Sequence, residues 1–295
     1  MKTPVFTGAS VAIVTPFNED FSVNYEKLAD LIELQIAGGT SAITICGTTG
    51  EASALDDAEH KECIRFAVEK VAGRIPVIAG TGSNDTAYAI QLSKYAQEVG
   101  ADALLQVTPY YNKTTQAGLI RHFTAVADSV DIPIILYNVP SRTGMSITAD
   151  TYKTLSAHPN INGAKEASGN FTLIAQTLSK CGDELNIWSG NDDQAVPVMA
   201  LGGKGVISVA SNIAPRLVAD MCKAALSGDF ATAGRMQTEY FDFFNDIFCE
   251  VNPIPIKAAM NMAGMNVGSL RMPLCEIGAD HAELLKKTLT RLNII

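Results

Sequence analysis

The sequence lacks several features that define whole classes of protein. Basic residues are outnumbered, with 22 Lys and Arg against 31 Asp and Glu and a net charge of −9. No basic cluster could follow a phosphate backbone, so a nucleic-acid partner is not expected. No apolar run approaches the about 18 residues of a membrane span, and the start, MKTPVFTGAS, lacks the apolar core of a secretion signal. We therefore expect a cytoplasmic protein without a membrane partner.

Paired cysteines and clustered histidines are also missing. The six cysteines form no C-x-x-C pair, and the four histidines form no H-E-x-x-H cluster. The cysteines are most simply reduced, mostly buried thiols, and a structural or catalytic zinc is not expected. Gly80-Thr81-Gly82 lacks the third glycine of a dinucleotide fingerprint and is interpreted as a turn. Asp192-Asp193 could ligate a metal, but a helix N-cap after Gly190 is the preferred interpretation.

What the sequence does contain is a repeated unit, a short apolar strand followed by a helix with one apolar face. Such alternation indicates a parallel sheet with right-handed crossovers. Eight units fit an α/β (β/α)8 TIM barrel better than an open, doubly wound sheet. The strands are expected at 9–14, 42–46, 76–79, 103–107, 134–137, 161–165, 185–189 and 205–209.

The strand pattern stops before residue 229. Helical periodicity continues at 230–248, 256–262 and 279–292, which predicts a three-helix appendage. We therefore expect a catalytic barrel at 1–228 and a C-terminal helical domain at 229–295. No low-complexity linker separates them, so the appendage is expected to pack on the barrel.

Lys165 ends the sixth predicted strand, where packing alone explains a lysine poorly. Lysine is almost never fully buried without a partner, because removing an ammonium from water is costly. One interpretation pairs Lys165 with Glu166 or extends its amine to solvent. The other is a desolvated amine that attacks a carbonyl group.

The remaining candidates lie at strand ends, where barrels of this class place their active sites. Each has a plain structural alternative. The turn at 47–50 could cap the following helix, and Tyr137 could be an amphipathic core residue. Tyr110-Tyr111 could be an interface aromatic pair, and Arg142 a solvated loop charge. Their joint placement with Lys165 favours one site that could bind a carboxylate, shuttle protons and attack a ketone. The segments are Gly47-Thr48-Thr49-Gly50-Glu51, Thr108-Pro109-Tyr110-Tyr111-Asn112 and Tyr137-Asn138-Val139-Pro140-Ser141-Arg142-Thr143-Gly144.

Five motifs together resemble the dihydrodipicolinate synthase family of pyruvate-dependent class I aldolases, to which N-acetylneuraminate lyase is related. The resemblance runs from the first strand to the C-terminal helices, and Arg142 within SRTG favours this branch over the sugar-acid lyases. The motifs are GTTGE at 47–51, TPYYN at 108–112, YNVPSRTG at 137–144, KEASG at 165–169 and NPIPIK at 252–257.

This resemblance implies a lyase that condenses pyruvate with L-aspartate 4-semialdehyde in diaminopimelate and lysine biosynthesis. Lys165 would form a Schiff base with C2 of pyruvate, and the resulting enamine would attack the aldehyde. Tyr137 would be the general acid and base, and Thr48 and Tyr111 would complete a proton relay. The family is usually a homotetramer, a pair of tight dimers, in which Tyr111 comes from a neighbouring subunit.

The resemblance also implies which residues bind the substrates. Thr49 would hold the pyruvate carboxylate, together with its own backbone N–H. Ile207 would contact pyruvate through its backbone. Arg142 would bind the semialdehyde carboxylate as a bidentate fork. No metal or organic cofactor is needed for this chemistry.

One region departs from the family pattern. Lysine-inhibited members carry a His and a Glu where this chain has Asp57 and Tyr88, whereas His60, Asn84 and Tyr110 match. Tyr88 supplies no anion for the ammonium of lysine, and losing a buried charge partner costs a few kcal/mol. We therefore expect feedback inhibition by lysine to be weak or absent.

Two other functions remain open at this point. One is an aldolase of the same superfamily that acts on a sugar acid or on 2-keto-3-deoxygluconate. The other is a catalytically silent barrel that binds a keto acid as a sensor. Arg142 argues against the first, and the presence of Lys165, Tyr137 and the relay residues argues against the second.

Overall fold

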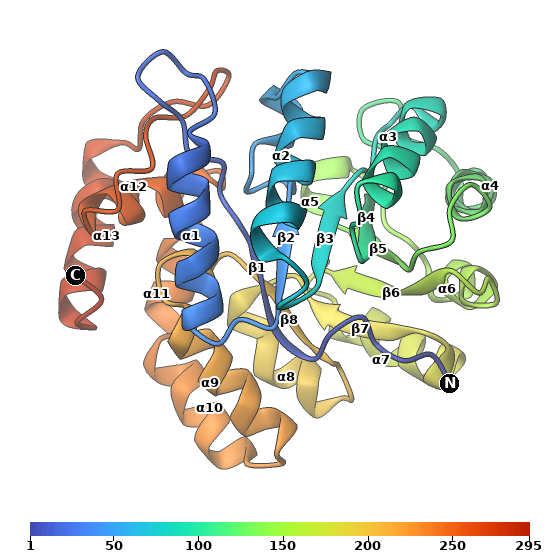
Figure 1. Cartoon of the computed structure of the whole chain (residues 1–295). Helices are drawn as coiled ribbons and strands as arrows, with labels where there is room; N and C mark the ends of the chain where they lie inside the picture. The colour runs from blue at the N-terminus through green and yellow to red at the C-terminus, as the bar shows by residue number, and fades with distance from the viewer.

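Eight parallel strands close into a barrel at the centre of the molecule (Figure 1). The computed structural model describes residues 1–295. Each strand pairs with the next along the chain, and β8 returns to β1, with Gly8 opposite Gly205. The predicted (β/α)8 barrel is thereby confirmed. The strands are β1 (Gly8–Ala12), β2 (Ala42–Ile45), β3 (Val77–Gly80), β4 (Ala103–Val107), β5 (Ile134–Asn138), β6 (Ile161–Glu166), β7 (Asn186–Ser189) and β8 (Gly205–Ser208).

Helices follow the strands and cover the outside of the barrel, as Figure 1 shows. Within the YNVPSRTG motif one helical turn, α5, forms where only a strand end was expected. The helices of the barrel are α1 (Tyr25–Ala37), α2 (Asp57–Val71), α3 (Thr86–Glu98), α4 (Gln116–Ala127), α5 (Pro140–Thr143), α6 (Ala149–Ser156), α7 (Phe171–Cys181), α8 (Ala195–Ala200) and α9 (Pro215–Leu226). Short 3-10 turns are η1 (Ala52–Ala54), η2 (Gly182–Glu184), η3 (Asp192–Gln194) and η4 (Ala210–Asn212).

Local sequence signals set the start of α2 and the end of α1. The Asp56 side chain accepts from the backbone N–H of Glu59 at 2.8 Å, and the Glu59 carboxylate accepts from Asp56 N–H at 3.2 Å. This reciprocal pair is a capping box, for which the Asp-x-x-Glu spacing at 56–59 is typical. Helix α1 ends before Gly38, and Gly39 adopts φ +86°, a conformation that glycine reaches without strain.

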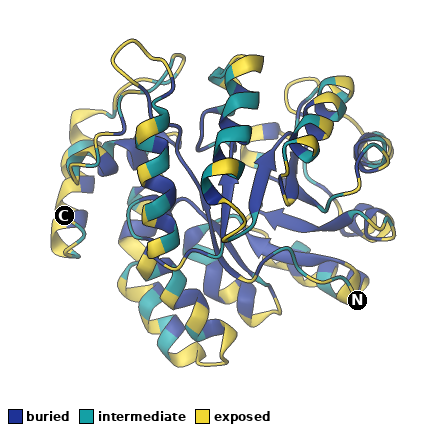
Figure 2. Cartoon of the chain, in the orientation of Figure 1, coloured by how far each residue is buried: buried dark blue, intermediate teal, exposed yellow.

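The core has two apolar parts, one inside the barrel and one between the barrel and its helices. Figure 2 shows the strands buried and the exposed residues on the outer faces of the helices. Phe6, which precedes β1, stacks on Trp188 of β7 inside the barrel, with ring centres 5.0 Å apart. Side chains fill the barrel, so only its rims are open to a ligand.

The chain after the barrel is helical, as predicted. The helix expected at 230–248 is divided at Tyr240, whose backbone leaves helical geometry, into α10 (Phe230–Glu239) and α11 (Phe241–Asp246). Helices α12 (Ile254–Met262) and α13 (Ala279–Arg291) follow and contact each other. The division of the chain into two domains at residues 228 and 229 stays a prediction.

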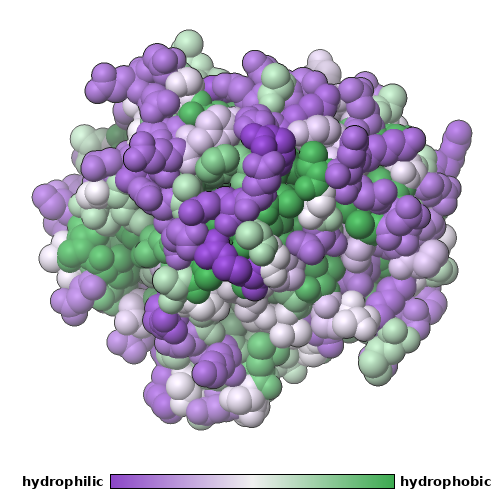
Figure 3. All heavy atoms as spheres, in the orientation of Figure 1, coloured by the Kyte–Doolittle hydropathy of each residue, from purple (hydrophilic) through white to green (hydrophobic).

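The outer surface is largely polar. Figure 3 shows hydrophilic side chains over much of one face, with hydrophobic side chains between them. None of the helices combines the length and the apolar character that crossing a membrane requires. The cysteines are free thiols: Cys275 is exposed, Cys249 is half-buried, and the other four are buried, as expected.

Candidate active site

Lys165 lies near the end of β6 with its side chain inside the barrel, and it is only 6% exposed. Its neighbours across the sheet are Tyr137 on β5 and Trp188 on β7, both part of the apolar group inside the barrel. Gly190 lies against the lysine: a Cβ at this glycine would be 3.1 Å from Lys165 Cε and 2.6 Å from Ala167 Cβ. Gly190 therefore leaves the space that the lysine side chain occupies.

Glu166 does not pair with the amine of Lys165. Consecutive strand residues point to opposite faces, and Glu166 lies outside the barrel wall in a hydrogen-bond network of its own. Its carboxylate accepts from Asn138 Nδ2 at 3.0 and 3.1 Å, Tyr152 Oη at 2.9 Å and Ser168 N–H at 2.9 Å. Burial raises the pKa of Glu166 against these bonds, which lower it. The interpretation that pairs Lys165 with Glu166, or exposes the lysine to solvent, is wrong.

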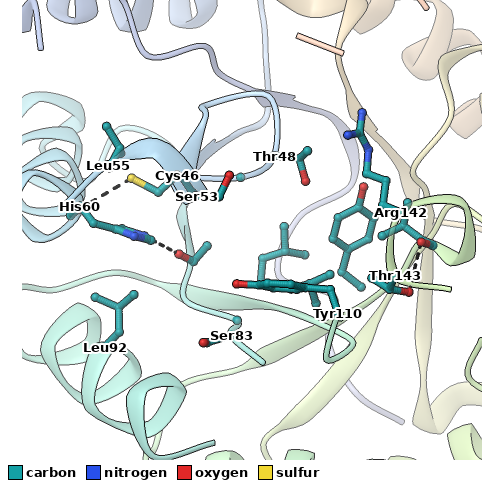
Figure 4. A pocket seen from close by; sticks show the side chains of 18 of the residues that line it. Cys46, Thr48, Ser53, Leu55, His60, Ser83, Leu92, Tyr110, Arg142 and Thr143 are labelled. Atoms are coloured by element: carbon teal, nitrogen blue, oxygen red, sulfur yellow. Dashed lines mark hydrogen bonds between the residues drawn. The ribbon is translucent and has the colours of Figure 1, made fainter. Parts of the chain in front are cut away.

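A cavity of about 560 Å³ opens at the carboxyl ends of β2 to β5 and is lined by Tyr137, the neighbour of Lys165. Lys165, Thr49 and Ile207 themselves are not among its lining residues. Thr48, Tyr137 and Arg142 line it, and Figure 4 shows Thr48 and Arg142 at the same end of the pocket. Lys165 Nζ lies 4.4 Å from the centre of the Tyr137 ring, within reach of a cation–π contact. Ile207 is buried in the barrel wall on β8, in the same apolar group as Tyr137. The structure thus brings residues of β5, β6, β8 and the β2–α2 loop to one rim.

The Gly-Thr-Thr-Gly-Glu turn after β2 is rich in unused hydrogen-bond donors. Cys46 and Glu51, at its two ends, adopt φ +55° and +52°, which is uncommon for residues other than glycine. The backbone N–H groups of Thr48 and Thr49 donate to no acceptor in the chain. Adjacent free N–H groups in a turn form a concave donor set that suits an anion. A carboxylate is therefore a natural ligand for this turn.

A buried ion pair joins this turn to the C-terminal segment. Lys257 Nζ donates to Glu51 Oε1 at 2.8 Å, and the two side chains are 1% and 0% exposed. The ammonium also donates to the carbonyls of Thr15 (2.9 Å) and Ser269 (2.7 Å), while Glu51 Oε2 accepts from Arg271 N–H at 3.0 Å. Burial lowers the pKa of Lys257, and Glu51 opposes that shift. All three ammonium donors are satisfied, so the pair fixes the end of the turn.

Arg142 comes from α5 and is exposed at the mouth of the cavity. One of its donors is held by the protein, because Nη2 donates to the backbone carbonyl of Asn252 at 3.0 Å. No carboxylate of the chain pairs with Arg142 in the structure, and its other guanidinium N–H groups have no partner in the chain. The guanidinium is thus available to an anionic ligand at the mouth of the cavity.

The two tyrosines after β4 lie differently. Tyr110 lines the cavity, and its carbonyl accepts from Asn84 Nδ2 at 3.1 Å. Tyr111 is 93% exposed, adopts φ +69° and does not line the cavity. Within one copy of the chain, Tyr111 does not join Thr48 and Tyr137.

Asp192 does not cap a helix, and that interpretation of the sequence is wrong. Asn191 occupies the N-cap position of η3, and Asp192 turns instead toward the end of β8. Its carboxylate accepts from Ser208 Oγ (2.5 Å), Val209 N–H (2.9 Å) and Ala210 N–H (3.1 Å). Burial raises the pKa of Asp192 against these three bonds, which lower it. A buried carboxylate therefore holds the loop that follows Ile207.

A second arm of the cavity extends toward α2 and α3, where Figure 4 places His60 and Leu92. Here Tyr88 Oη donates to Asp57 Oδ1 at 3.0 Å, and Lys61 Nζ donates to Asp57 Oδ2 at 2.7 Å. Burial and the Asp57 carboxylate raise the pKa of Tyr88 to about 12. Both oxygens of Asp57 are thus engaged by the chain itself.

Gly80 and Gly82 serve close packing of the backbone, in agreement with their interpretation as a turn. A Cβ at Gly80 would lie 2.1 Å from the carbonyl oxygen of Cys46, and one at Gly82 would lie 2.4 Å from Val107 N. The second and fourth strands therefore approach β3 at these two points. No ligand role is needed to explain either glycine.

Four residues that support the site were not assigned to it from the sequence: Gly190, Asp192, Asn252 and Lys257. The last two belong to the NPIPIK motif, where a buried Asn and Lys within a run of Pro and Ile are a signal that could have been followed. The other two carry no local signal, because their partners lie on other strands.

Comparison with known proteins gives a uniform result. The model of the dihydrodipicolinate synthetase family matches residues 5–292. A 4-hydroxy-tetrahydrodipicolinate synthase of Thermoanaerobacter sp. (strain X514) is 55% identical over 293 residues, covering 99% of this chain and 98% of that protein.

Solved structures superpose on nearly the whole chain. The chloride-inhibited dihydrodipicolinate synthase of Acinetobacter baumannii, solved with pyruvate, superposes with a TM-score of 0.96 at 42% identity, covering 98% of this chain and 99% of that one. An enzyme of the same name from Cyanidioschyzon merolae, solved with lysine bound, gives a TM-score of 0.96 at 37% identity, covering 99% and 100%.

Proposed function

The chain belongs to the dihydrodipicolinate synthetase family, and we propose that it condenses pyruvate with L-aspartate 4-semialdehyde on the amine of Lys165. Its activity is that of a 4-hydroxy-tetrahydrodipicolinate synthase, a lyase of diaminopimelate and lysine biosynthesis, as in its relatives. The observation that supports Lys165 is its burial at the end of β6 without a carboxylate partner.

The amine of Lys165 attacks C2 of pyruvate, and loss of water leaves an imine. The protonated imine withdraws electrons from C3, which loses a proton to become the nucleophilic carbon of an enamine. That carbon forms a bond to the aldehyde carbon of the semialdehyde. The amino group of the product then attacks the imine carbon, closes the ring and releases Lys165. Tyr137, whose ring lies beside Lys165 Nζ, carries protons to and from the reacting atoms.

The two substrates each bring a carboxylate, and the site offers two separate places for them. The free N–H groups of Thr48 and Thr49, with the Thr49 hydroxyl, take the carboxylate of pyruvate. Ile207 contacts pyruvate through its backbone on β8. Arg142, at the mouth of the cavity, takes the carboxylate of the semialdehyde. A small keto acid is thus held deep, and its partner arrives from outside.

Thr48 and Tyr137 line the same cavity without a direct hydrogen bond between them, so the proton relay needs a third member. We assign this role to Tyr111 of a second copy of the chain, because Tyr111 is 93% exposed and does not line the cavity of its own chain. The active form would then be an oligomer, and a tetramer built from two tight dimers supplies such a partner.

A coupled assay of aldehyde acceptors tests this function. With pyruvate as donor, we expect turnover of L-aspartate 4-semialdehyde in the wild type, little turnover of sugar aldehydes, and none of either in Lys165→Ala. Lys165→Arg, which keeps the charge but not the nucleophile, is the matched control and should also be inactive. Turnover of sugar aldehydes alone would instead support a sugar-acid lyase, and binding of pyruvate without any turnover would support a keto-acid sensor.

A further inference from the structure

Asn252 joins the two carboxylate-binding residues of the site. Its side chain is buried, and Nδ2 donates to Thr49 Oγ1 at 2.9 Å. Its backbone carbonyl accepts from Arg142 Nη2 at 3.0 Å. The residue comes from the segment before α12, far along the chain from both partners. One asparagine therefore contacts the deep and the outer substrate-binding residue at once.

The hydrogen bond to Thr49 has a direction that matters. A threonine hydroxyl has one proton and two lone pairs. Because Thr49 Oγ1 accepts from Asn252 Nδ2, one lone pair is used and the proton of Thr49 stays free to donate elsewhere. The nearby free N–H groups of Thr48 and Thr49 are donors as well. The Thr49 hydroxyl and the two backbone N–H groups are all hydrogen-bond donors, so the ligand they suit is an anion.

The amide oxygen of the Asn252 side chain makes no hydrogen bond that would explain an asparagine at this position. Oδ1 is buried and has no hydrogen-bond partner. Buried polar atoms without partners are rare in folded proteins and call for an explanation. The one bond that Asn252 makes through its side chain is the bond to Thr49.

We propose that Asn252 is a positioning residue that turns the Thr49 hydroxyl into a fixed donor for the carboxylate of pyruvate. This inference rests on the proposed function, since it assumes that pyruvate binds at Thr49. It concerns the side chain of Asn252 alone. The bond to Arg142 uses the backbone carbonyl and survives substitution of the side chain, so binding of the semialdehyde should be affected less.

Two substitutions separate an oriented donor from a mere contact. Asn252→Ala leaves the Thr49 hydroxyl free to rotate, whereas Asn252→Asp keeps the shape but replaces the donor with an acceptor. The carboxylate of Asn252→Asp would accept the Thr49 proton and turn it away from pyruvate. We measure the pyruvate concentration that gives half-maximal trapping by borohydride, and the KM for each substrate. We expect the pyruvate concentration for half-maximal trapping to be lowest in the wild type, higher in Asn252→Ala and highest in Asn252→Asp. In Asn252→Asp it should be about tenfold above the wild-type value.

The added charge of Asn252→Asp is controlled in a Thr49→Val background. If the Thr49 hydroxyl is responsible for the effect, the half-saturating pyruvate concentrations of the Asn252→Asp and Asn252→Ala variants should differ much less in the Thr49→Val background, which lacks that hydroxyl. An undiminished difference would mean that charge alone acts, and the proposal would be wrong. Equal values for Asn252→Ala, Asn252→Asp and the wild type would also overturn it.

A matched substitution elsewhere monitors folding. Asn162 is buried at the other end of β6, where its Nδ2 donates to the carbonyl of Thr3 at 2.8 Å. Asn162→Asp should leave half-saturation by pyruvate unchanged, with thermal unfolding recorded for every variant. If the proposed function itself fails, the wild type traps no pyruvate at all. If only the role of Asn252 fails, the wild type traps pyruvate and the variants match it.

Discussion

His122 on α4 is a buried histidine whose titration should make the stability of the molecule depend on pH. Its Nδ1 pairs with Thr86 Oγ1 at 2.9 Å, and its Nε2 has no partner. Burial lowers the pKa of His122 in the folded chain, whereas in the unfolded chain it is about 6.5. Below that pH the unfolded state binds more protons, so stability falls as pH falls.

We therefore expect the free energy of unfolding to fall more steeply between about pH 7 and pH 5 in the wild type than in His122→Gln. The difference in slope should reach at most about 1.4 kcal/mol per pH unit. Urea unfolding at a series of pH values measures it. Burial also lowers the pKa of His60, but His60 is present in both proteins, so its contribution cancels in the comparison. Parallel pH profiles would show that His122 is not responsible.

Asp57 and Tyr88 bear on regulation by lysine. In the structure Asp57 already accepts from Tyr88 and Lys61, so the ammonium of a bound lysine would have to compete with Lys61 for this carboxylate, in line with the expectation of weak inhibition. Initial rates should be unchanged at millimolar lysine. Tyr88→Glu supplies a new anion and serves as the comparison; it should be inhibited by lysine more strongly than the wild type. Tight inhibition of the wild type would contradict this account.

At the scale of elements, the turn after β2 depends on α12. Lys257→Met removes the ammonium from a fully buried pair and leaves the Glu51 carboxylate without its counter-ion, with the backbone N–H of Arg271 as its remaining donor. We expect a loss of about 3–5 kcal/mol in the free energy of unfolding, measured by denaturant titration. Adding Glu51→Gln to Lys257→Met should restore part of the loss. A change below about 1 kcal/mol, typical of an exposed pair, would refute the role assigned to this contact.

The elements themselves were largely predictable, because each follows from a local pattern. Alternating strands and helices imply the barrel, and the capping box at Asp56 marks the start of α2. Lys165 and Tyr137 could be expected at one rim because parallel strands end on the same side. Asn252 and Lys257 could not be placed in this way: they contact the turn after β2 across 203 and 206 residues of sequence. Contacts between residues so far apart in the sequence produce no periodic pattern by which they could be predicted.

At the scale of the whole molecule, the proton relay that we propose requires two copies of the chain. A site that contains Lys165 of one copy and Tyr111 of another can be assembled from two defective proteins. In a mixed pair of Tyr111→Phe and Lys165→Ala subunits, one of the two sites is intact. Random pairing should therefore restore about a quarter of the wild-type activity after the variants are co-expressed. Activity no greater than the average of the two variants would show that a second copy of the chain does not supply Tyr111.

The central claim is that Lys165 is the amine that binds pyruvate. It is tested most directly by the mass of the intact protein after incubation with pyruvate and borohydride, followed by peptide mapping. We predict that one reduced pyruvate is added per chain, that it maps to the peptide containing Lys165, and that Lys165→Ala gains nothing. An unchanged mass in the wild type, or an adduct on another lysine, would contradict the account.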